Sequence, residues 1–199
     1  LNPLFYCTII PPQKWIHPFK GGYHSPLIRQ MTMIKTRNNN YLSEISNKVD
    51  EMLPVYDSTN ALQESSWRIN QRVLQVMDTF YNLNTPIGKI PPTEDVPLPP
   101  KPTQISDKVK FKEWLETDNN KQKWINWKHS AKKVHEFNAK IVSKRIQFKK
   151  IIELAKQFQL ESEIYFPHQL DFRGRAYPTP MFLNPQGVEH ARALLQFSK

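Results

Sequence analysis

Apolar side chains recur every three or four residues along the stretch from Thr59 to Tyr81. The stripe consists of Leu62, Ile69, Val73, Val76 and Phe80. This period places its members on one face of a helix. Asn60 and Gln63 stand three residues apart near the start of the stripe, which is the spacing of a capping box. The pattern therefore predicts an amphipathic helix over residues 59–81.

A second and longer apolar seam lies between Lys121 and Leu160. Its members are Val134, Phe137, Ile141, Lys144, Phe148, Ile151, Ala155 and Phe158, among which only Lys144 is polar. A seam this regular is typical of a helix that packs on another helix, and we expect that partner to be helix 59–81. The two antiparallel helices would form an elongated projection. A shorter helix is expected over Asp107 to Glu116, with Ser106 as its N-cap.

The two helical stretches are separated by a connector rich in proline. The segment from Thr85 to Pro102 holds seven of the 17 prolines in the chain. Proline fixes the backbone in an extended form and removes a hydrogen-bond donor. We interpret residues 85–102 as a stiff spacer, and a proline-rich ligand for a recognition domain is the alternative.

The two ends of the chain do not show a helical period. Residues 1–56 are irregular and aromatic, with turn-forming pairs at Pro11-Pro12 and Gly21-Gly22. Residues 161–199 read as short strands and turns, followed by a helix that begins at Glu189 and continues to Lys199. The expected fold class is therefore mainly α with a small α+β part. Because the chain does not begin with Met, we expect its true N-terminus to lie upstream.

Lysine and arginine outnumber aspartate and glutamate by 28 to 18, which gives a net charge of +10. The excess concentrates on the long helix, at Lys128, Lys132, Lys133, Lys140, Lys144, Arg145, Lys149, Lys150 and Lys156. A one-sided run of this kind favours contact with phosphates over a merely solvated face. Large aromatic residues occur nearby at Trp114, Trp124 and Trp127, and we expect them to pack against helices, with base stacking as the alternative.

The remaining composition excludes several classes of protein. One cysteine, Cys7, cannot form a disulfide framework within the chain and fits a reducing compartment. The six histidines are scattered without a zinc-binding spacing. No apolar run approaches the length of a membrane span, so we expect no membrane partner and a cytoplasmic location.

The most informative motif is Asp171-Phe172-Arg173-Gly174-Arg175. Glycine lets the backbone approach a ligand closely, and arginine forks can grip phosphate or sugar oxygens. The motif lies between Phe166-Pro167-His168 and a stretch containing Ala176-Tyr177-Pro178 that ends at Asn184-Pro185-Gln186-Gly187. In this context the segment resembles the single-subunit DNA-dependent RNA polymerases of phages and mitochondria.

The resemblance extends over nearly the whole chain. Residues 10–15 and 21–23 are similar to the family's P-P-x-x-W…G-G-Y segment, and Trp67-Arg68-Ile69-Asn70 to its W-[KR]-[IV]-N helix. The returning thumb helix is matched by His135, Asn138, Ala139, Ser143, Lys144, Arg145 and Ala155. The resemblance implies the end of an N-terminal domain at 1–56, a helical polymerase thumb at 57–160 and the first palm segment at 161–199.

The resemblance also implies which residues contact nucleic acid. Arg173 and Arg175 would donate to the RNA–DNA hybrid, Asp171 would orient an arginine and complete the turn, and Gly174 would sit at the turn itself. Phe172 would pack near the template strand, and Tyr177 would face the minor groove. On the thumb, the predicted contacts are Lys140, Lys144 and Arg145, while Lys35 and Arg37 would meet nucleic acid leaving the site.

The family's catalytic parts are expected outside this chain. Nucleotidyl transfer in the family uses two carboxylates that hold paired Mg ions, and the resemblance places them after Lys199. We therefore expect Mg on a partner chain, a second polymerase subunit that carries the fingers and the rest of the palm. Template DNA and the RNA transcript are the other expected partners. The chain alone would be inactive and, in a phage, would act in the host bacterial cytoplasm.

Other interpretations remain open. The chain could be an excised piece of a longer polymerase, although the split enzyme is favoured. It could also be a non-catalytic nucleic-acid-binding module derived from a polymerase, or a helical scaffold whose basic face only aids solubility. For the split enzyme, an apolar interface with the partner subunit is expected at Tyr165, Phe166, Met181, Phe182 and Leu194.

Overall fold

A computed structural model describes residues 5–25, 31–85 and 87–199. Predictions made above for the N-terminal segment and the connector include residues 1–4, 26–30 and Pro86, which lie outside the described residues. The helices are α1 (Asn39–Ser46), α2 (Leu53–Gln63), α3 (Gln71–Asn82), α4 (Lys108–Leu115), α5 (Asp118–Phe158) and α6 (Glu189–Ala193). The strands are β1 (Gln13–His17), β2 (Lys20–Gly22), β3 (Trp67–Ile69), β4 (His168–Leu170), β5 (Ala176–Pro178) and β6 (Leu195–Phe197). The described chain is mainly helical with small antiparallel sheets, as predicted.

The predicted helix over residues 59–81 is wrong as a single element. These residues instead form the end of α2, strand β3 and most of α3. Asn70 accepts a hydrogen bond from the backbone N–H of Val73 (3.1 Å) and begins α3 as its N-cap. Strand β3 interrupts the helical period because it pairs with β6, which contains Phe197. The rings of Trp67 and Phe197 stack at 4.2 Å.

The same pairing corrects the expected C-terminal helix. Helix α6 ends at Ala193, and the following residues form β6 instead of continuing the helix to Lys199. The register joins Trp67 to Phe197 and Ile69 to Leu195. The sheet therefore joins segments that the sequence analysis placed in the thumb and in the palm.

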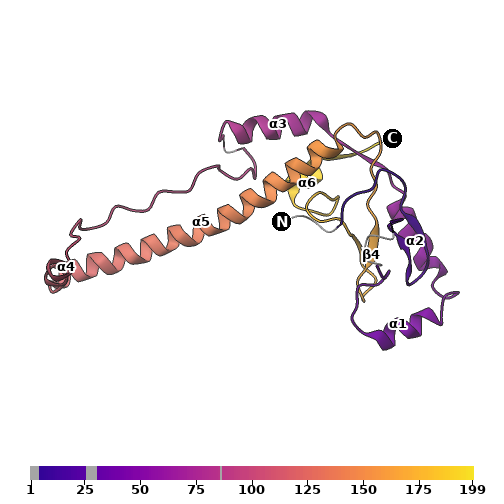
Figure 1. Cartoon of the computed structure of the whole chain (residues 1–199), viewed down its shortest axis with the longest axis horizontal. Helices are drawn as coiled ribbons and strands as arrows, with labels where there is room; N and C mark the ends of the chain where they lie inside the picture. The colour runs from indigo at the N-terminus through magenta and orange to yellow at the C-terminus, as the bar shows by residue number, and fades with distance from the viewer. Residues whose placement is uncertain (1–4, 26–30, 86) are drawn as a thin grey trace.

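The projection is formed by α5 with the connector beside it, and not by the expected pair of antiparallel helices. Figure 1 shows α5 extending away from the rest of the molecule with α4 at its far end. Its 41 residues correspond to a length of about 60 Å at 1.5 Å per residue. Helix α3 packs on the C-terminal part of α5, as expected, but it has only 12 residues. Phe148 and Ile151 are fully buried at this end, whereas Phe137 is 52% exposed.

The proline-rich connector lies along α5 instead of only spanning the gap. The Asn138 side chain accepts from the backbone N–H of Val96 (3.0 Å) and donates to its carbonyl (2.9 Å). Trp127 Nε1 donates to the carbonyl of Pro99 (2.9 Å). An extended backbone cannot satisfy its own polar groups, so the side chains of α5 serve as partners. The connector is therefore a spacer that is hydrogen-bonded along α5.

The far end of the arm is an aromatic cluster. Trp124 stacks on Trp127 with 4.8 Å between ring centres. Phe111 of α4 meets Trp124 edge-on at 4.9 Å and stacks on Trp114 at 6.1 Å. The predicted packing role of these tryptophans is confirmed. The N-cap of α4 lies one residue after the predicted Ser106. Asp107 is the cap, and it accepts from the backbone N–H groups of Val109 and Lys110.

Two hydrophobic cores lie at the root of the arm. The larger joins α3, the last turns of α5, and α6, and includes Phe148, Phe166 and Leu194. The smaller surrounds Trp15 and includes Met33. Tyr165, Phe166 and Leu194, predicted to face a partner subunit, are buried in this chain, with exposures of 7%, 1% and 0%. They are core residues, and Met181, 56% exposed, is the member of that set that is most open to solvent.

Asn60 and Gln63 do not form a capping box, because both are buried in a polar network between α2 and β1. Asn60 Oδ1 accepts from the backbone N–H of Trp15 (2.7 Å), and Asn60 Nδ2 donates to the Trp15 carbonyl (3.0 Å). Gln63 donates to the carbonyl of Gln13 (3.0 Å) and accepts weakly from the N–H of His168 (3.4 Å). Burial lowers the pKa of His168 and favours its neutral form. The network connects the N-terminal segment to strand β4.

Replacing Asn60 with alanine is expected to lower the free energy of unfolding by about 2–4 kcal/mol, because two buried backbone groups of Trp15 would lose their partner. Urea unfolding followed by tryptophan fluorescence measures the change. Asn126→Ala on the exposed surface of α5 is the matched control, with an expected change of less than about 0.5 kcal/mol. Equal changes in the two variants would show that the network adds no stability.

Candidate nucleic-acid interface

Strands β4 and β5 form a hairpin whose loop is the Asp171–Arg175 motif. Asp171 Oδ1 accepts from the backbone N–H groups of both Arg173 and Arg175, each at 2.9 Å. The backbone N–H of Gly174 donates to the Asp171 carbonyl (3.0 Å). Gly174 has φ of +80°, a conformation that side chains with a Cβ rarely adopt. Asp171 therefore closes the loop through backbone groups, and Gly174 permits its left-handed step.

The motif's large side chains lie on the exposed side of this loop. Phe172 is 65% exposed, and the Arg173 guanidinium lies 5.0 Å from the centre of its ring. Arg175 is also exposed, and Tyr177 on β5 is 45% exposed. Within residues 5–25, 31–85 and 87–199, no ion pair joins Arg173 or Arg175 to a carboxylate. Asp171 completes the turn, as expected, through bonds to the backbone N–H groups of both arginines.

Lys35 lies beside this hairpin. The backbone N–H of Lys35 donates to the carbonyl of Leu170 (2.8 Å), and the Leu170 N–H donates to the Met33 carbonyl (2.8 Å). A cavity of about 390 Å³ is lined by Lys35, Gln169, Leu170, Asp171, Tyr177, Pro178 and Thr179. The fold thus brings Lys35 together with two residues of the predicted hybrid site. Arg37 follows two residues later and is exposed.

Lysines on α5 form a stripe that continues the buried face of its root. At 100° per residue, positions 133, 137, 140 and 144 fall on the same face as Phe148 and Ile151. Lys133, Lys140 and Lys144 are exposed on that face, and Phe137 lies among them. We call residues 133, 137, 140 and 144 the lysine face. The sequence analysis placed Lys133 in the basic run but did not single it out as a contact, and it did not consider Phe137, although the seven-residue spacing of 133 and 140 was available.

Arg145 lies on a different face of α5. Its guanidinium pairs with Asp95 and donates to the carbonyl of Thr93 (2.8 Å). Only 18% of its side chain is exposed. The structure thus gives Arg145 a role in holding the connector, and its contact with nucleic acid stays a prediction. The sequence offered no sign of this pairing, because Asp95 lies in the connector, 50 residues before Arg145.

The described residues do not assemble a metal-ligating cluster. Across residues 5–25, 31–85 and 87–199, no three His, Cys, Asp or Glu side chains come close enough to hold an ion. The donor set therefore does not fit the Mg pair of a nucleotidyl-transfer site. Among the same residues, no helix has both the length and the apolar character that crossing a bilayer requires.

Comparison with known proteins decides the family. No family model matches the chain. It is 32% identical to the DNA-directed RNA polymerase of Enterobacteria phage T3 and 30% identical to T7 RNA polymerase of Escherichia phage T7, with all of this chain covered and 21% of each relative. It is 30% identical to the mitochondrial DNA-directed RNA polymerase 1 of Arabidopsis thaliana, over 95% of this chain and 18% of that protein.

The chain is homologous to single-subunit DNA-directed RNA polymerases. The resemblance predicted from the Asp171–Arg175 motif and its flanking residues is therefore confirmed. The chain spans about a fifth of the length of these polymerases. The homology extends through the arm and the hairpin alike, since the alignment to the two phage polymerases covers all of the chain.

Proposed function

We propose that this chain is the part of a DNA-directed RNA polymerase that grips the RNA–DNA hybrid and the template. In this proposal α3, the connector, α4 and α5 form the thumb, residues 161–199 begin the palm, and residues 1–56 end an N-terminal domain. The observation that carries the proposal is the hairpin loop, because its closure by Asp171 leaves two arginine side chains exposed beside Lys35.

The hairpin would act through its free donors. Asp171 is occupied by backbone N–H groups, so Arg173 and Arg175 keep their guanidinium groups for phosphate or ribose oxygens. Phe172 would pack against the template strand, with Arg173 held over its ring. Tyr177 would reach the minor groove with its hydroxyl group.

The arm would hold the duplex farther from the hairpin. Lys133 and Lys144 are separated by eleven residues, which is about 17 Å along α5. This distance corresponds to about five nucleotide steps at a rise of 3.4 Å. Three lysines on one face could therefore contact several successive phosphates of one strand. Binding of this kind does not depend on sequence and keeps a polymerase on its template.

The two-metal site would be contributed by a second polymerase subunit that carries the fingers and the rest of the palm. Mg²⁺ bound there would stabilise the attacking and leaving oxygens of nucleotidyl transfer. This chain would supply positioning, in accord with its exposed cationic side chains. Exposed Met181 and Phe197, at 56% and 61%, are the apolar side chains that we expect the second subunit to cover.

Reconstitution tests the proposal. The purified chain is expected to make no RNA alone and to gain template-directed synthesis when it is mixed with a polypeptide carrying the remaining four-fifths of a homologous polymerase. Arg175→Ala should slow elongation about 10- to 150-fold, which corresponds to the loss of a charge-assisted hydrogen bond of about 1.5–3 kcal/mol.

Arg192→Ala, which removes an exposed arginine on α6, is the matched control and should leave elongation unchanged. Co-purification of the two polypeptides should also survive Arg175→Ala. If that variant instead separates the complex, the loop serves assembly and the proposed grip is wrong. RNA synthesis by the chain alone would contradict the assignment of the metal site to a second subunit.

A further inference from the structure

A cavity of about 420 Å³ lies beside the lysine face, between α5, the start of the connector and α6. Phe137, Ile141 and Lys144 line its α5 side. Their spacing of four and three residues places these side chains in one row along the helix. Ile141 is 5% exposed, whereas Phe137 is 52% exposed. The ring of Phe137 is therefore an accessible aromatic surface at this cavity.

The connector supplies further apolar groups to the wall. Ile90, Pro91 and Pro92 line the cavity, together with Val188, which precedes α6. A planar ring that stacks on Phe137 inside this cavity would bury additional apolar surface against these side chains. The volume is within the range of sites that hold small ring systems.

Gln147 adds an amide to the same wall. Its side chain is half-buried and has no hydrogen-bond partner in the part of the chain that the structure describes. A glutamine amide presents two donors and an acceptor. Nucleobases carry donors and acceptors along the edges of their rings. The cavity thus offers both an aromatic face for stacking and a polar group for the edge of a heterocyclic ring.

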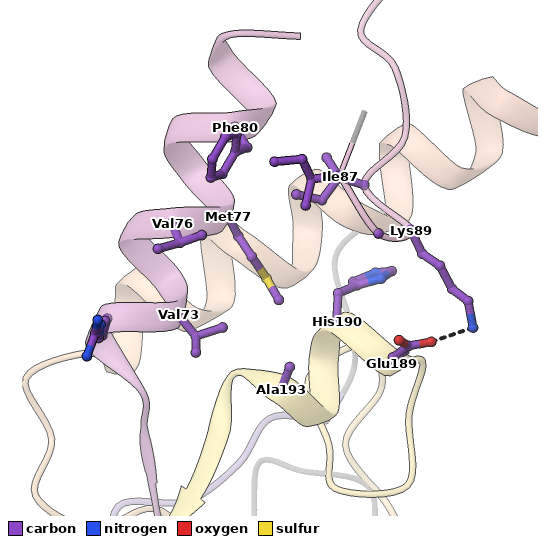
Figure 2. A pocket seen from close by; sticks show the side chains of 12 residues that line it. Val73, Val76, Met77, Phe80, Ile87, Lys89, Glu189, His190 and Ala193 are labelled. Carbon is purple, nitrogen blue, oxygen red and sulfur yellow. Dashed lines mark ion pairs between the residues drawn. The ribbon is translucent and has the colours of Figure 1, made fainter. Parts of the chain in front are cut away.

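The charges around the cavity favour an anion. Lys144 lines it, and Lys140 and Lys133 follow on the same face of α5. Over residues 5–25, 31–85 and 87–199, no ion pair joins these three lysines to a carboxylate. Lys89 and Glu189 also line the cavity but neutralise each other in an ion pair. Figure 2, which is centred on the adjoining cavity between α3 and α6, marks this pair with a dashed line.

We propose that the cavity receives one unpaired base of a nucleic-acid strand, stacked on the ring of Phe137, while the adjoining phosphates contact Lys140 and Lys144. Exposed aromatic rings set among cations are the arrangement with which proteins bind single strands without regard to sequence. The inference rests on the proposed function, because the strand would continue from the hybrid held along the lysine face. A fully paired hybrid keeps its bases stacked inside and offers none to Phe137.

Fluorescence anisotropy with the full 199-residue chain tests this site. The probes are RNA–DNA hybrids with an overhang of about four nucleotides, which is either intact or abasic. An abasic overhang carries the same phosphates without the bases, so the comparison removes the electrostatic contribution. The hybrid with the intact overhang should bind at least about fivefold more tightly, which is the lower limit for stacking one base on an aromatic side chain. Overhangs on the RNA strand and on the DNA strand, compared in turn, identify which strand enters the cavity.

Phe137→Leu should remove the preference for the intact overhang and leave the affinity for the abasic hybrid unchanged. Phe137→Trp keeps an aromatic ring and should retain the preference. Ile146→Leu is the matched control, because Ile146 is 50% exposed on the opposite face of α5. This variant should bind both hybrids as the unmodified chain does.

The outcomes separate the site from the function on which it rests. Equal affinity of the unmodified chain for the intact and the abasic overhang would overturn the inference alone. A preference that survives in Phe137→Leu would also overturn it, since the base would then stack elsewhere. Failure of both hybrids to bind would contradict the proposed function, and the inference would fall with it.

Discussion

Replacing Lys133, Lys140 and Lys144 together with glutamine is expected to weaken binding of an RNA–DNA hybrid by about two orders of magnitude at 0.1 M salt. Each lysine that neutralises a phosphate releases about one counterion, so the loss of three contacts removes a large electrostatic part of the affinity. The negative slope of log affinity against log salt concentration should become shallower by about two to three. Fluorescence anisotropy with a labelled hybrid, at salt concentrations from about 50 to about 200 mM, measures the affinity and its dependence on salt.

A matched triple substitution separates position from charge. Lys128, Lys132 and Lys149 are also exposed on α5 but lie on other faces of the helix, and their replacement by glutamine changes the net charge equally. We expect this second variant to keep most of the affinity and a steeper salt slope. Equal loss in the two triple variants would mean that net charge alone accounts for binding, and the lysine face would have no special role.

Replacing Phe148 with alanine is expected to lower the free energy of unfolding by about 3–5 kcal/mol. Phe148 is fully buried, and its ring lies 5.0 Å from that of Tyr81 and 5.2 Å from that of His190. Its removal would leave a cavity where α3, α5 and α6 meet. Urea unfolding followed by circular dichroism measures the change, because α5 is the longest helix and contributes the largest single share of the helical signal.

Phe137→Ala is the control on the same helix. Phe137 lies on the same stripe as Phe148 but is 52% exposed, so its removal should cost less than about 1 kcal/mol. The comparison tests whether the apolar seam changes from core to surface along α5. A loss in Phe137→Ala as large as that in Phe148→Ala would indicate that the outer part of the arm is packed against another element.

Local periodicity was enough to predict the long helix of the arm, but not that this helix projects without a second helix beside it. The expected limits of the long helix, Lys121 and Leu160, differ from those of α5 by only a few residues, because a seam over many turns averages out local ambiguity. The connector's extended form followed from its prolines in the same way. Its attachment to Asn138 and Arg145 could not be predicted, because those contacts join residues far apart in the sequence.

Long-range pairing accounts for the largest errors. Nothing near Trp67 indicates a strand, since its partner Phe197 lies near the other end of the chain. Asn60 has the right residue type and spacing for a cap, but its amide instead pairs with the backbone of Trp15. The Asp171–Arg175 motif identified the family, whereas the position of Lys35 beside it depended on the pairing of Ile34 with Leu170.

The shared stripe of Phe148 and Lys144 has a consequence for how this segment can vary. Inserting one residue between them would rotate the outer part of α5 by about 100° relative to its root. The lysine face would then point away from the proposed duplex contact, although every side chain would still be present. An insertion of seven residues would restore the direction to within about 20° and only lengthen the reach. Homologous arms should therefore tolerate changes of length there in steps of a heptad far better than single-residue indels.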